Sequence, residues 1–551
     1  MVVIVDGRPY PMDTTPSSKL LFSGLAPAAN NGYYYAKIDS SSNIIDHEPF
    51  IREPFEADRS PNEHYNRSRN KWEIAQLPQV LEPLPLIQRI DSKLHKDGEI
   101  PTIHITGDAN GINNMHKKAD DDIQVNTTMT WISLDDVQSF SGVEFEVSGR
   151  QARESAKLSY NIKLPKKSYL YGYRRLKLRA LDTDPSYIRE ALGFKMLRSA
   201  GVPTTDFSFV RLYINDQAIG LFGLIEKFKD PWLRNEFADG DKDYQQGTLY
   251  QGKYTNVKAE LLGDRVSDLS YYGDNPWPYK LGEYKIAEDP SSGESNYKAL
   301  IELTKFLASA PATVDAWEAR WDMESVLRAM ALEMLMGFAD GYLTVADNFF
   351  VYQMAPNGTK FVFILWDIDL ILGSTALVKL SQMETGDWRE LASTLTKRPL
   401  MQFLHVPEYA KRFDDLIREL NDKLLSLDVL GQYIDDTVAM IQQDVAWDLS
   451  CPRVSHIPLL RSHDFAVLAH LLGLIGQTDV DIRTVNDFGR RQRRNDVGLM
   501  QAVNGPTGYS SLAGVKEFIK VKHQNVKNHY DGVKSDNDNR HKSNLLDILP
   551  I

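Results

Sequence analysis

The chain has 551 residues, of which 42% are hydrophobic and 25% are charged, a composition typical of soluble globular proteins. Domains usually contain about 100–200 residues, so this length predicts about two to four folding units. The net charge of −12 argues against binding to nucleic acid or to an anionic membrane. One basic run is the exception, and its simplest interpretation is a solvated helix face. It comprises Arg490, Arg491, Arg493 and Arg494.

Signals for the cellular compartment point in two directions. The single cysteine, Cys451, excludes an intrachain disulfide and is typical of a reducing compartment. Three N-x-S/T sequons, at Asn66, Asn126 and Asn357, favour a secreted glycoprotein instead. No apolar run reaches the roughly 20 residues of a transmembrane helix. No signal peptide precedes Val2, so we expect a cytosolic protein or one whose signal was removed.

The N-terminal part is predicted to be rich in short strands. Turn signals such as Asp-Gly and Asn-Asn-Gly separate three β-rich runs within residues 1–55. These runs are residues 2–5, 20–22 and 33–38. We expect a small β-sandwich-like domain there. Residues 56–98 are rich in proline and charge and should form an extended connector wrapped on the next domain.

Residues 99–235 should form a β-rich lobe with one main helix. Apolar and polar residues alternate in five runs, as in half-buried strands. These are residues 102–106, 129–133, 143–148, 158–164 and 175–181. A helix is predicted next, with Asp184 as N-cap and Pro185 at its first position. Two further strands, 209–214 and 220–225, follow it.

Residues 236–522 should form a mainly helical lobe, followed by a polar tail at 523–551. An amphipathic pattern predicts a long helix at 317–336, and further helices are predicted at 397–478 and 515–529. A strand pair, 349–353 and 360–365, interrupts the helices. The order of elements predicts an α+β fold with two lobes, and nucleotide clefts commonly lie between such lobes.

Residues 361–373 carry the strongest chemical signal. A buried strand there ends in Asp367 and Asp369, and burying unpaired carboxylates is costly unless a cation compensates them. Residues two positions apart project from the same face of a strand, and paired oxygen ligands suit Mg²⁺ or Mn²⁺. The alternative is a strand end whose carboxylates cap a helix or pair with arginine.

A second acidic segment lies just upstream, with Asp340, Asp347 and Asn348. Phosphoryl transfer needs an acid that accepts the hydroxyl proton and a group that holds metal, and protein kinases place these groups in this order. The spacing of 8 from Asp340 to Asn348 is wider than the roughly 5 of the kinase catalytic loop. Neither His-Arg-Asp nor Asp-Phe-Gly occurs. Spacing alone therefore leaves the kinase interpretation open.

The first lobe offers matching partners for a nucleotide. Lys177 lies in a predicted strand and Glu190 in the helix after it, which is the order of the lysine and glutamate of a kinase small lobe. The loop 149–157, with Arg150 and Lys157, joins two strands and could cover phosphates. Simple surface charge on a strand and a helix is the alternative for Lys177 and Glu190.

Several motifs, in order over roughly residues 100–380, resemble the CotH family of spore-coat kinases and fungal surface proteins. The motifs are Ser159-Tyr-Asn-Ile-Lys-Leu164, Arg174-Arg-Leu-Lys-Leu-Arg-Ala180, Asp184-Pro-Ser-Tyr-Ile-Arg-Glu190, Val210-Arg-Leu-Tyr-Ile-Asn215, Gly220-Leu-Phe-Gly-Leu-Ile-Glu226, Asp340-Gly-Tyr342, Asp347-Asn348 and Trp366-Asp-Ile-Asp369. The N-terminal β-region and the polar tail are similar to the fungal, mucoralean branch.

The resemblance implies an atypical protein-kinase-like fold that binds ATP with Mg²⁺ or Mn²⁺ and phosphorylates protein Ser/Thr, including itself. It implies that Asp340 is the catalytic base, that Asn348 and Asp367 are metal ligands, and that Asp369 is a second acid. The ATP-binding residues implied by strand order are Lys177, Glu190, Arg150 and Lys157, with Glu226 near adenine at the interlobe hinge.

Fungal members of this family are usually secreted and often anchored at the cell surface, so we expect signal and anchor to have been removed from this chain. Some act as invasins that bind a host receptor, but residues 343–348 depart from the invasin pattern. Three hypotheses therefore remain: a metal-dependent protein kinase, a surface adhesin on a kinase-like scaffold, and a metal-dependent glycosyltransferase.

Overall fold

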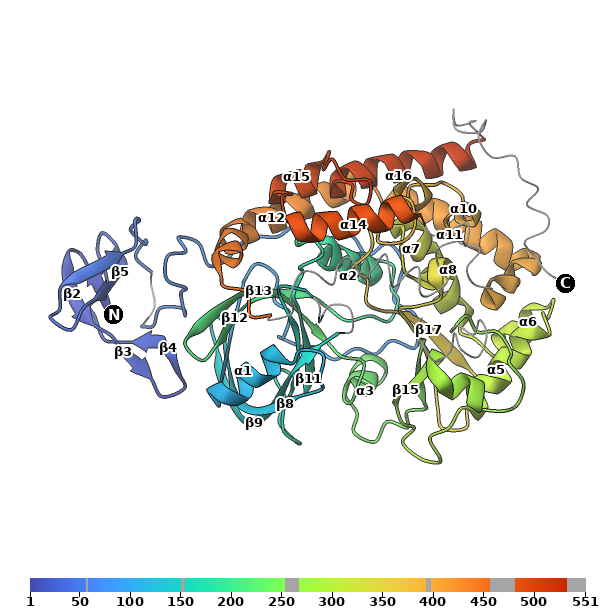
Figure 1. Ribbon diagram of the computed structural model, residues 1–551, viewed down its shortest axis with the longest axis horizontal. Helices are drawn as coiled ribbons and strands as arrows, with labels where there is room; N and C mark the ends of the chain where they lie inside the picture. The colour runs from blue at the N-terminus through green and yellow to red at the C-terminus, as the bar shows by residue number, and fades with distance from the viewer. Residues whose placement is uncertain are drawn as a thin grey trace.

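The computed structural model describes residues 1–55, 58–149, 153, 155–252, 267–392, 398–455 and 481–532. Three parts follow one another along the long axis of the molecule (Figure 1). They are small N-terminal sheets, a closed β-barrel, and a mainly helical part that carries a second sheet. The predicted mixed α+β architecture is confirmed.

The N-terminal part consists of a four-stranded sheet, ordered β2-β1-β5-β6, and a two-stranded sheet of β3 and β4. The predicted strands are present, and three more join them. The six are β1 (Val2–Val5), β2 (Arg8–Pro11), β3 (Asp13–Thr15), β4 (Ser18–Ser23), β5 (Tyr33–Ile38) and β6 (Ile44–His47). Side chains of β1 alternate, so Val2 and Ile4 pack on one face of the sheet and Val3 and Val5 on the other.

Seven strands form the barrel, in the order β10-β11-β13-β12-β7-β8-β9. They are β7 (Thr102–Gly107), β8 (Gln124–Ile132), β9 (Val137–Ser148), β10 (Ser159–Lys163), β11 (Arg175–Arg179), β12 (Ser208–Ile214) and β13 (Gln217–Glu226). All seven strands predicted in this region are found. The rings of Phe145 and Tyr160 stack inside at 4.8 Å, with Phe222 beside them. Parallel pairing of β12 with β7, which was not predicted, closes the barrel.

The main helix of this region, α2 (Arg189–Ser199), begins later than predicted. Asp184 is not its N-cap, because Tyr187 has a left-handed φ of 61° and interrupts the chain before the helix. The Asp184 carboxylate instead organises a turn, accepting hydrogen bonds from the backbone N–H groups of Ser186 at 2.9 Å and Arg189 at 3.0 Å. The prediction of an N-cap at Asp184 was therefore wrong.

The predicted strand pair forms the centre and one edge of a second sheet, ordered β15-β14-β16-β17. The pair is β16 (Phe349–Gln353) and β17 (Phe361–Leu365), which are antiparallel. Two strands that were not predicted, β14 (Leu249–Gly252) and β15 (Tyr284–Glu288), complete the sheet. This sheet positions the segments on both sides of β16 and β17, which carry the acidic residues singled out above.

The remaining elements of the described chain are helices. They are α1 (Ala109–Lys117) on the barrel, then α3 (Trp232–Phe237), η2 (Tyr279–Glu283), α5 (Lys298–Ala308), α6 (Val314–Glu318), α7 (Met323–Met336), α8 (Tyr342–Val345), α9 (Leu380–Met383), α10 (Trp388–Leu391), η3 (Pro399–His405), α11 (Pro407–Lys423), α12 (Leu427–Ser450), α14 (Ile482–Arg494), α15 (Leu499–Asn504) and α16 (Val515–Tyr530). The single helix predicted at 317–336 is wrong, because Trp321 bridges to Phe361 of β17 and separates α6 from α7. Of the helices predicted at 397–478, the part at 456–480 lies outside the described residues.

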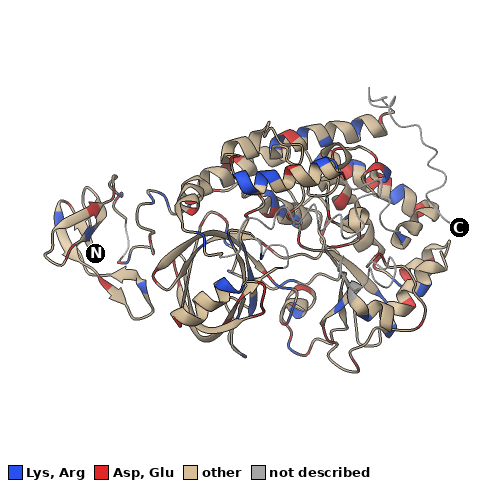
Figure 2. Ribbon diagram, in the orientation of Figure 1, with Lys and Arg blue, Asp and Glu red and all other residues tan. Residues whose placement is uncertain are grey.

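The basic run on α14 is only partly a solvated face. Figure 2 shows Lys and Arg gathered on this helix. Arg491 is buried and donates hydrogen bonds to the Thr183 carbonyl at 2.8 Å and to the Ser374 hydroxyl at 2.9 Å. Arg490, in contrast, is half exposed and pairs with Asp487 on the same helix. Arg491 therefore joins α14 to the segments that precede α2 and follow β17.

Helix α12 fastens the helical part to the barrel. Asp444 accepts hydrogen bonds from Arg211 of β12 and from Arg67 of the connector, at distances between 2.7 and 3.3 Å. Asp448, one turn later, pairs with Lys157 at 2.7 Å and accepts a hydrogen bond from the Leu221 N–H at 2.8 Å. The two carboxylates hold the barrel against α12. Within the described residues, no helix has the length and apolarity that crossing a membrane requires.

Candidate active site

Backbone pairing brings the two acidic segments together. In the β16–β17 pair, Phe349 lies opposite Leu365, so Asn348 and Trp366 are neighbours at the end of the sheet. The Trp366 N–H donates to the Asn348 carbonyl at 2.9 Å. A second hydrogen bond, from the Ala339 N–H to the Leu370 carbonyl at 2.9 Å, joins the residue before Asp340 to the residue after Asp369. Residues 340–348 and 366–370 thus line one site.

The backbone at this site adopts conformations that cost energy. Asn348 and Asp367 have φ values of 59° and 53°, and Ala346 and Leu372 are also left-handed. A left-handed conformation costs a residue with a side chain about 1–2 kcal/mol. Such residues persist where the surrounding structure fixes them, and they cluster at functional sites.

Asp340 and Asn348 form a direct pair. The Asn348 amide donates to Asp340 Oδ2 at 2.8 Å and to the Asp340 carbonyl at 3.1 Å. The other carboxylate oxygen, Oδ1, is buried and has no hydrogen-bond partner. Burial, followed by the charges of Asp369 and Asp347, raises the pKa of Asp340 well above its ordinary value. Asp340 therefore has one free oxygen and a strong tendency to take up a proton or face a cation.

Asp367 and Asp369 face cations of the barrel strand β11. Arg179 is hydrogen-bonded to Asp367 through Nη1, and its Nη2 lies 3.4 Å from Asp369 Oδ2. Lys177 Nζ lies 3.7 Å from Asp367 Oδ1. Both carboxyl side chains keep about 30% of their surface exposed. Burial raises the pKa of Asp369, and Asp367 raises it further, whereas Arg179 lowers it.

Helix α2 brings Glu190 over the same site. Arg179 Nε donates to the two Glu190 carboxylate oxygens at 2.7 and 3.0 Å. Close contact requires Gly193, because a Cβ there would lie 2.5 Å from Ile371 and 2.7 Å from Ile368. Burial raises the pKa of Glu190 to about 7, although Arg179 opposes the shift. The direct partner of Glu190 is thus Arg179, whereas Lys177 turns to Asp367.

The donor set fits a divalent cation in its chemistry. The carboxylates of Asp340, Asp367, Asp369 and Glu190 outnumber the cations Lys177 and Arg179, and one Asp340 oxygen is buried without a partner. Hard oxygen donors of this kind suit Mg²⁺ or Mn²⁺. Among the described residues, no three acidic, histidine or cysteine side chains converge as a closed metal cage. The guanidinium of Arg179 contacts both Asp367 and Asp369, the two acids that would have to converge on a bound cation.

The remaining predicted ATP-binding residues lie elsewhere or are engaged. Lys157 is buried, donates to the Leu221 carbonyl and pairs with Asp448 at 2.7 Å, so contacting phosphate would require breaking this pair. Arg150 lies outside the described residues. Glu226 is opposite Leu176 in the sheet, on the other face from Lys177, and its carboxylate accepts from Thr205 and lies 3.3 Å from His95 Nε2.

Glu226 therefore borders a different space from the acidic site. It lines a polar cavity of about 350 Å³ between the connector, the end of β13 and the far side of α2, together with His95 and Arg198. The carboxylate oxygen that Thr205 and His95 contact is Oε2.

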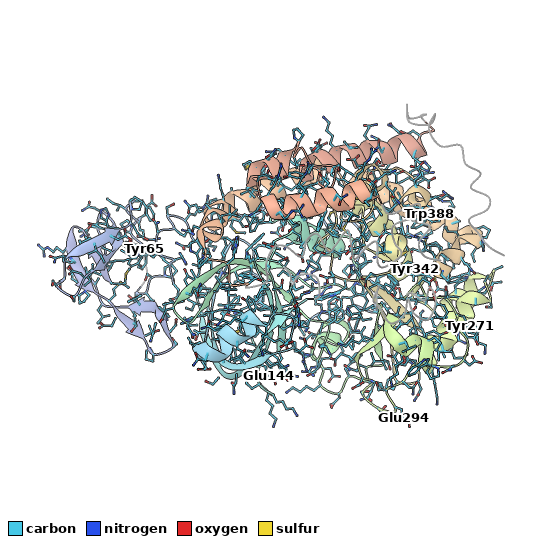
Figure 3. The ribbon with its side chains drawn as sticks, in the orientation of Figure 1. Tyr65, Glu144, Tyr271, Glu294, Tyr342 and Trp388 are labelled. Carbon is cyan, nitrogen blue, oxygen red and sulfur yellow. The ribbon has the colours of Figure 1, made fainter. Side chains whose placement is uncertain are left out.

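Two residues of the site, Arg179 and Glu333, were not predicted from the sequence. Arg179 lies two positions after Lys177 in a strand, so both project from the same face, and this alternation was the available signal. Glu333 of α7 is fully buried, and its carboxylate accepts from the N–H groups of Tyr342 at 3.1 Å and Leu343 at 2.8 Å. No local pattern marks Glu333 among its apolar neighbours. Figure 3 shows the labelled Tyr342 in the interior of the helical part, away from Glu294 at the rim.

These observations define a class of protein: a β-barrel joined to a helical part, with an acidic, cation-lined site between them. Comparison with known families is specific, because the sequence model of the CotH kinase protein family matches residues 145–450. The chain belongs to the CotH kinase family. The match includes Lys177, Arg179, Asp340 and both acids of the Asp-Ile-Asp segment.

Curated relatives place the chain beside proteins of a mucoralean fungus. It is 27% identical over 320 residues to Invasin CotH3 of Rhizopus delemar and equally to Invasin CotH2, covering 57% of this chain and 51% of each relative. Spore coat protein homolog 1 of the same fungus is 22% identical over 435 residues, which is 78% of this chain and 67% of that protein. The chain thus spans about half the length of Invasin CotH3 and of Invasin CotH2.

Proposed function

We propose that the protein is an atypical protein kinase that transfers the γ-phosphate of ATP to Ser or Thr hydroxyls, including its own. The observation that carries the proposal is the Asp340–Asn348 pair, joined at 2.8 Å, facing Asp367 and Asp369 across the β16–β17 sheet end. The barrel would serve as the small lobe of a kinase-like fold, and the helical part as the large lobe.

Asp340 would act as the general base. Its Oδ1 has no hydrogen-bond partner and can accept the hydroxyl proton as the oxygen attacks phosphorus, while Asn348 holds Oδ2 in place. A base works best when its pKa lies near the working pH, and the direction of the shift at Asp340 brings it closer. The proton moves to Asp340, the new bond forms between hydroxyl oxygen and phosphorus, and ADP leaves.

Asp367, Asp369 and the Asn348 side-chain oxygen would hold Mg²⁺ or Mn²⁺, which when bound would neutralise charge on the phosphates. Lys177 is the phosphate contact best supported by position, because its Nζ lies 3.7 Å from Asp367 and faces the same site. Burial lowers the pKa of Lys177, and Arg179 lowers it further, so a phosphate would be a favourable partner.

The cellular setting and the partners are part of the same proposal. Relatives in Rhizopus delemar are named invasins, which favours a secreted or cell-surface protein with Ser/Thr protein substrates and, as a second candidate function, binding to a host receptor. The adhesin function would not depend on Asp367, and this difference separates the two candidates.

The test is transfer of label from γ-labelled ATP to the protein, with Mn²⁺ or Mg²⁺, comparing the native chain with Asp367→Asn. We expect transfer by the native protein and a loss of about 100-fold or more in the variant, the size found when one transition-state contact is removed. No label with either metal would overturn the kinase. Receptor binding retained by both proteins would then support the adhesin, and turnover of a sugar nucleotide would support a glycosyltransferase.

A further inference from the structure

Arg179 contacts three carboxylates of the acidic site, although the proposed kinase mechanism gives it no role. Its Nε donates to both oxygens of Glu190, its Nη1 to Asp367, and its Nη2 lies 3.4 Å from Asp369. The side chain is only 9% exposed, so these contacts are made away from bulk water. One guanidinium thus joins β11, helix α2 and the segment after β17.

The neighbouring cation is placed differently. Lys177 Nζ lies 3.7 Å from Asp367, and among the described residues this acid is its only ion-pair partner. It projects from the same face of β11 and carries the same charge, but lacks the forked donors that reach two carboxylates. Lys177 therefore serves as an internal comparison for the effect of charge without the fork.

A carboxylate oxygen that accepts from a guanidinium cannot direct the same lone pair at a metal ion. Asp367 and Asp369 are the two acids to which a divalent cation is assigned above, and Arg179 contacts both. The guanidinium thus occupies the position from which a cation would neutralise these acids. It also supplies positive charge where acidic side chains would otherwise repel one another.

We propose that Arg179 is a built-in counter-ion, which holds the place of the divalent cation in the ligand-free protein and must leave Asp367 and Asp369 when the cation binds. This inference rests on the proposed function, because that function places the cation at these two acids. Guanidinium groups bind phosphate as they bind carboxylate, so bound nucleotide offers Arg179 new partners. Metal and nucleotide would then favour each other's binding.

The experiment measures Mn²⁺ binding in the absence of nucleotide, by the loss of the free-ion electron paramagnetic resonance signal. The proteins are the native chain, Arg179→Met, Arg179→Lys, Lys177→Met and Asp367→Asn. Arg179→Met removes both the positive charge and the branched N–H donors of the guanidinium. Arg179→Lys keeps the charge but removes the branched donors. Circular dichroism and thermal melting would show whether each variant folds. If Arg179→Met does not fold, Arg179→Lys still tests the inference, because it keeps a cation beside Glu190.

We expect both Arg179 variants to bind Mn²⁺ about tenfold or more tightly than the native chain, because a competing close contact is removed. Lys177→Met should gain less than about threefold, and Asp367→Asn should lose binding. Arg179→Lys binding no more tightly than the native chain, or Arg179→Met gaining no more than Lys177→Met, would overturn the inference.

Two further outcomes separate this inference from the function on which it rests. Equal Mn²⁺ affinity in the native, Arg179 and Lys177 proteins, with loss only in Asp367→Asn, would remove the role of Arg179 and leave the metal site standing. Binding of Mn²⁺ by none of the proteins would overturn both the role of Arg179 and the metal site of the proposed kinase.

Discussion

Single residues hold the segment after Asp340 in position from two sides. Glu333 accepts from the N–H groups of Tyr342 and Leu343, and Arg398 donates to the carbonyls of Leu343 at 2.5 Å and Thr344 at 3.2 Å. Burial raises the pKa of Glu333 to about 8, although both N–H groups oppose the shift. In the proposed kinase, Glu333 would therefore be a positioning residue, which acts through the backbone that follows Asp340.

Replacing Glu333 with glutamine should lower kcat while leaving the KM for ATP nearly unchanged. The amide offers one acceptor oxygen to two N–H groups and turns a donor towards the other, which costs about 1–3 kcal/mol at a buried site. The loss in kcat should be roughly tenfold, because about 1.4 kcal/mol corresponds to a factor of ten. Steady-state kinetics with varied ATP would measure both constants.

The matched control is Glu324→Gln on the same helix. Glu324 pairs with Arg328 and Arg412 near the surface. These pairs do not involve the segment that follows Asp340. The Glu324→Gln variant should therefore keep the native kcat and the native KM for ATP. An equal fall in kcat for both variants would assign the effect to helix α7 as a whole and contradict the positioning role of Glu333.

Residue chemistry was the part of the site that could be predicted best. Asp367 and Asp369 were singled out because acids at the end of a buried strand are costly without a partner. Asp340 and Asn348 were singled out because their order along the chain is that of the phosphoryl-transfer groups of protein kinases. The structure brings all four to one site. Arg179 was overlooked, because an arginine in a β-strand is common and only tertiary contacts reveal its three carboxylate partners. For the same reason, Lys157 could not be assigned to Asp448, which lies 291 positions away in the chain.

At the scale of elements, helix α12 is predicted to be the main fastening between the barrel and the helical part. Asp444→Asn should lower the free energy of unfolding by about 3–5 kcal/mol, because Arg211 and Arg67 would be left as buried, like-charged neighbours. Asp435→Asn, on the same helix, breaks only an exposed pair with Lys516 and should cost less than about 1 kcal/mol. Urea denaturation would measure both; equal, small losses would contradict this role of α12.

The same carboxylate predicts a dependence of stability on pH. Burial alone would raise the pKa of Asp444, but Arg211 and Arg67 lower it to about 2, below its ordinary value of 3.8. A lowered native pKa means that the unfolded chain takes up the proton first, so the stabilisation is complete above pH 3.8 and is lost as the pH falls through 2. The stability difference between native and Asp444→Asn proteins should therefore shrink over this range. A constant difference would show that the Asp444 charge contributes nothing.

Elements were predicted unevenly, and the reasons are physical. The barrel strands were found from the alternation of apolar and polar residues, although β11 is buried on both faces. The start of α2 was misplaced because Asp184 and Pro185 match the pattern of a helix start, while the left-handed Tyr187 that delays the helix leaves no trace in composition. The helix predicted at 317–336 was broken by Trp321, whose bridge to Phe361 is a tertiary contact.

At the scale of the whole molecule, the closure of the barrel and the second sheet depend on distant pairings. Strand β7 pairs with β12 over a separation that includes six other elements of the chain, and β14 joins β16 from about 100 residues away. Such pairings are fixed by packing of the whole chain rather than by local pattern. The mixed α+β architecture could be predicted from element order, but the barrel could not.

The most direct measurement of the central claim separates nucleotide binding from chemistry at Asp340. The native protein and Asp340→Asn would be compared for binding of Mn²⁺ with ATP and for transfer of labelled phosphate, under the same conditions. Because Asp340 is assigned the proton and Asp367 and Asp369 the metal, the account predicts that the variant binds Mn²⁺ and ATP with about native affinity and transfers phosphate at least about 100-fold more slowly. Transfer by Asp340→Asn at the native rate would contradict it.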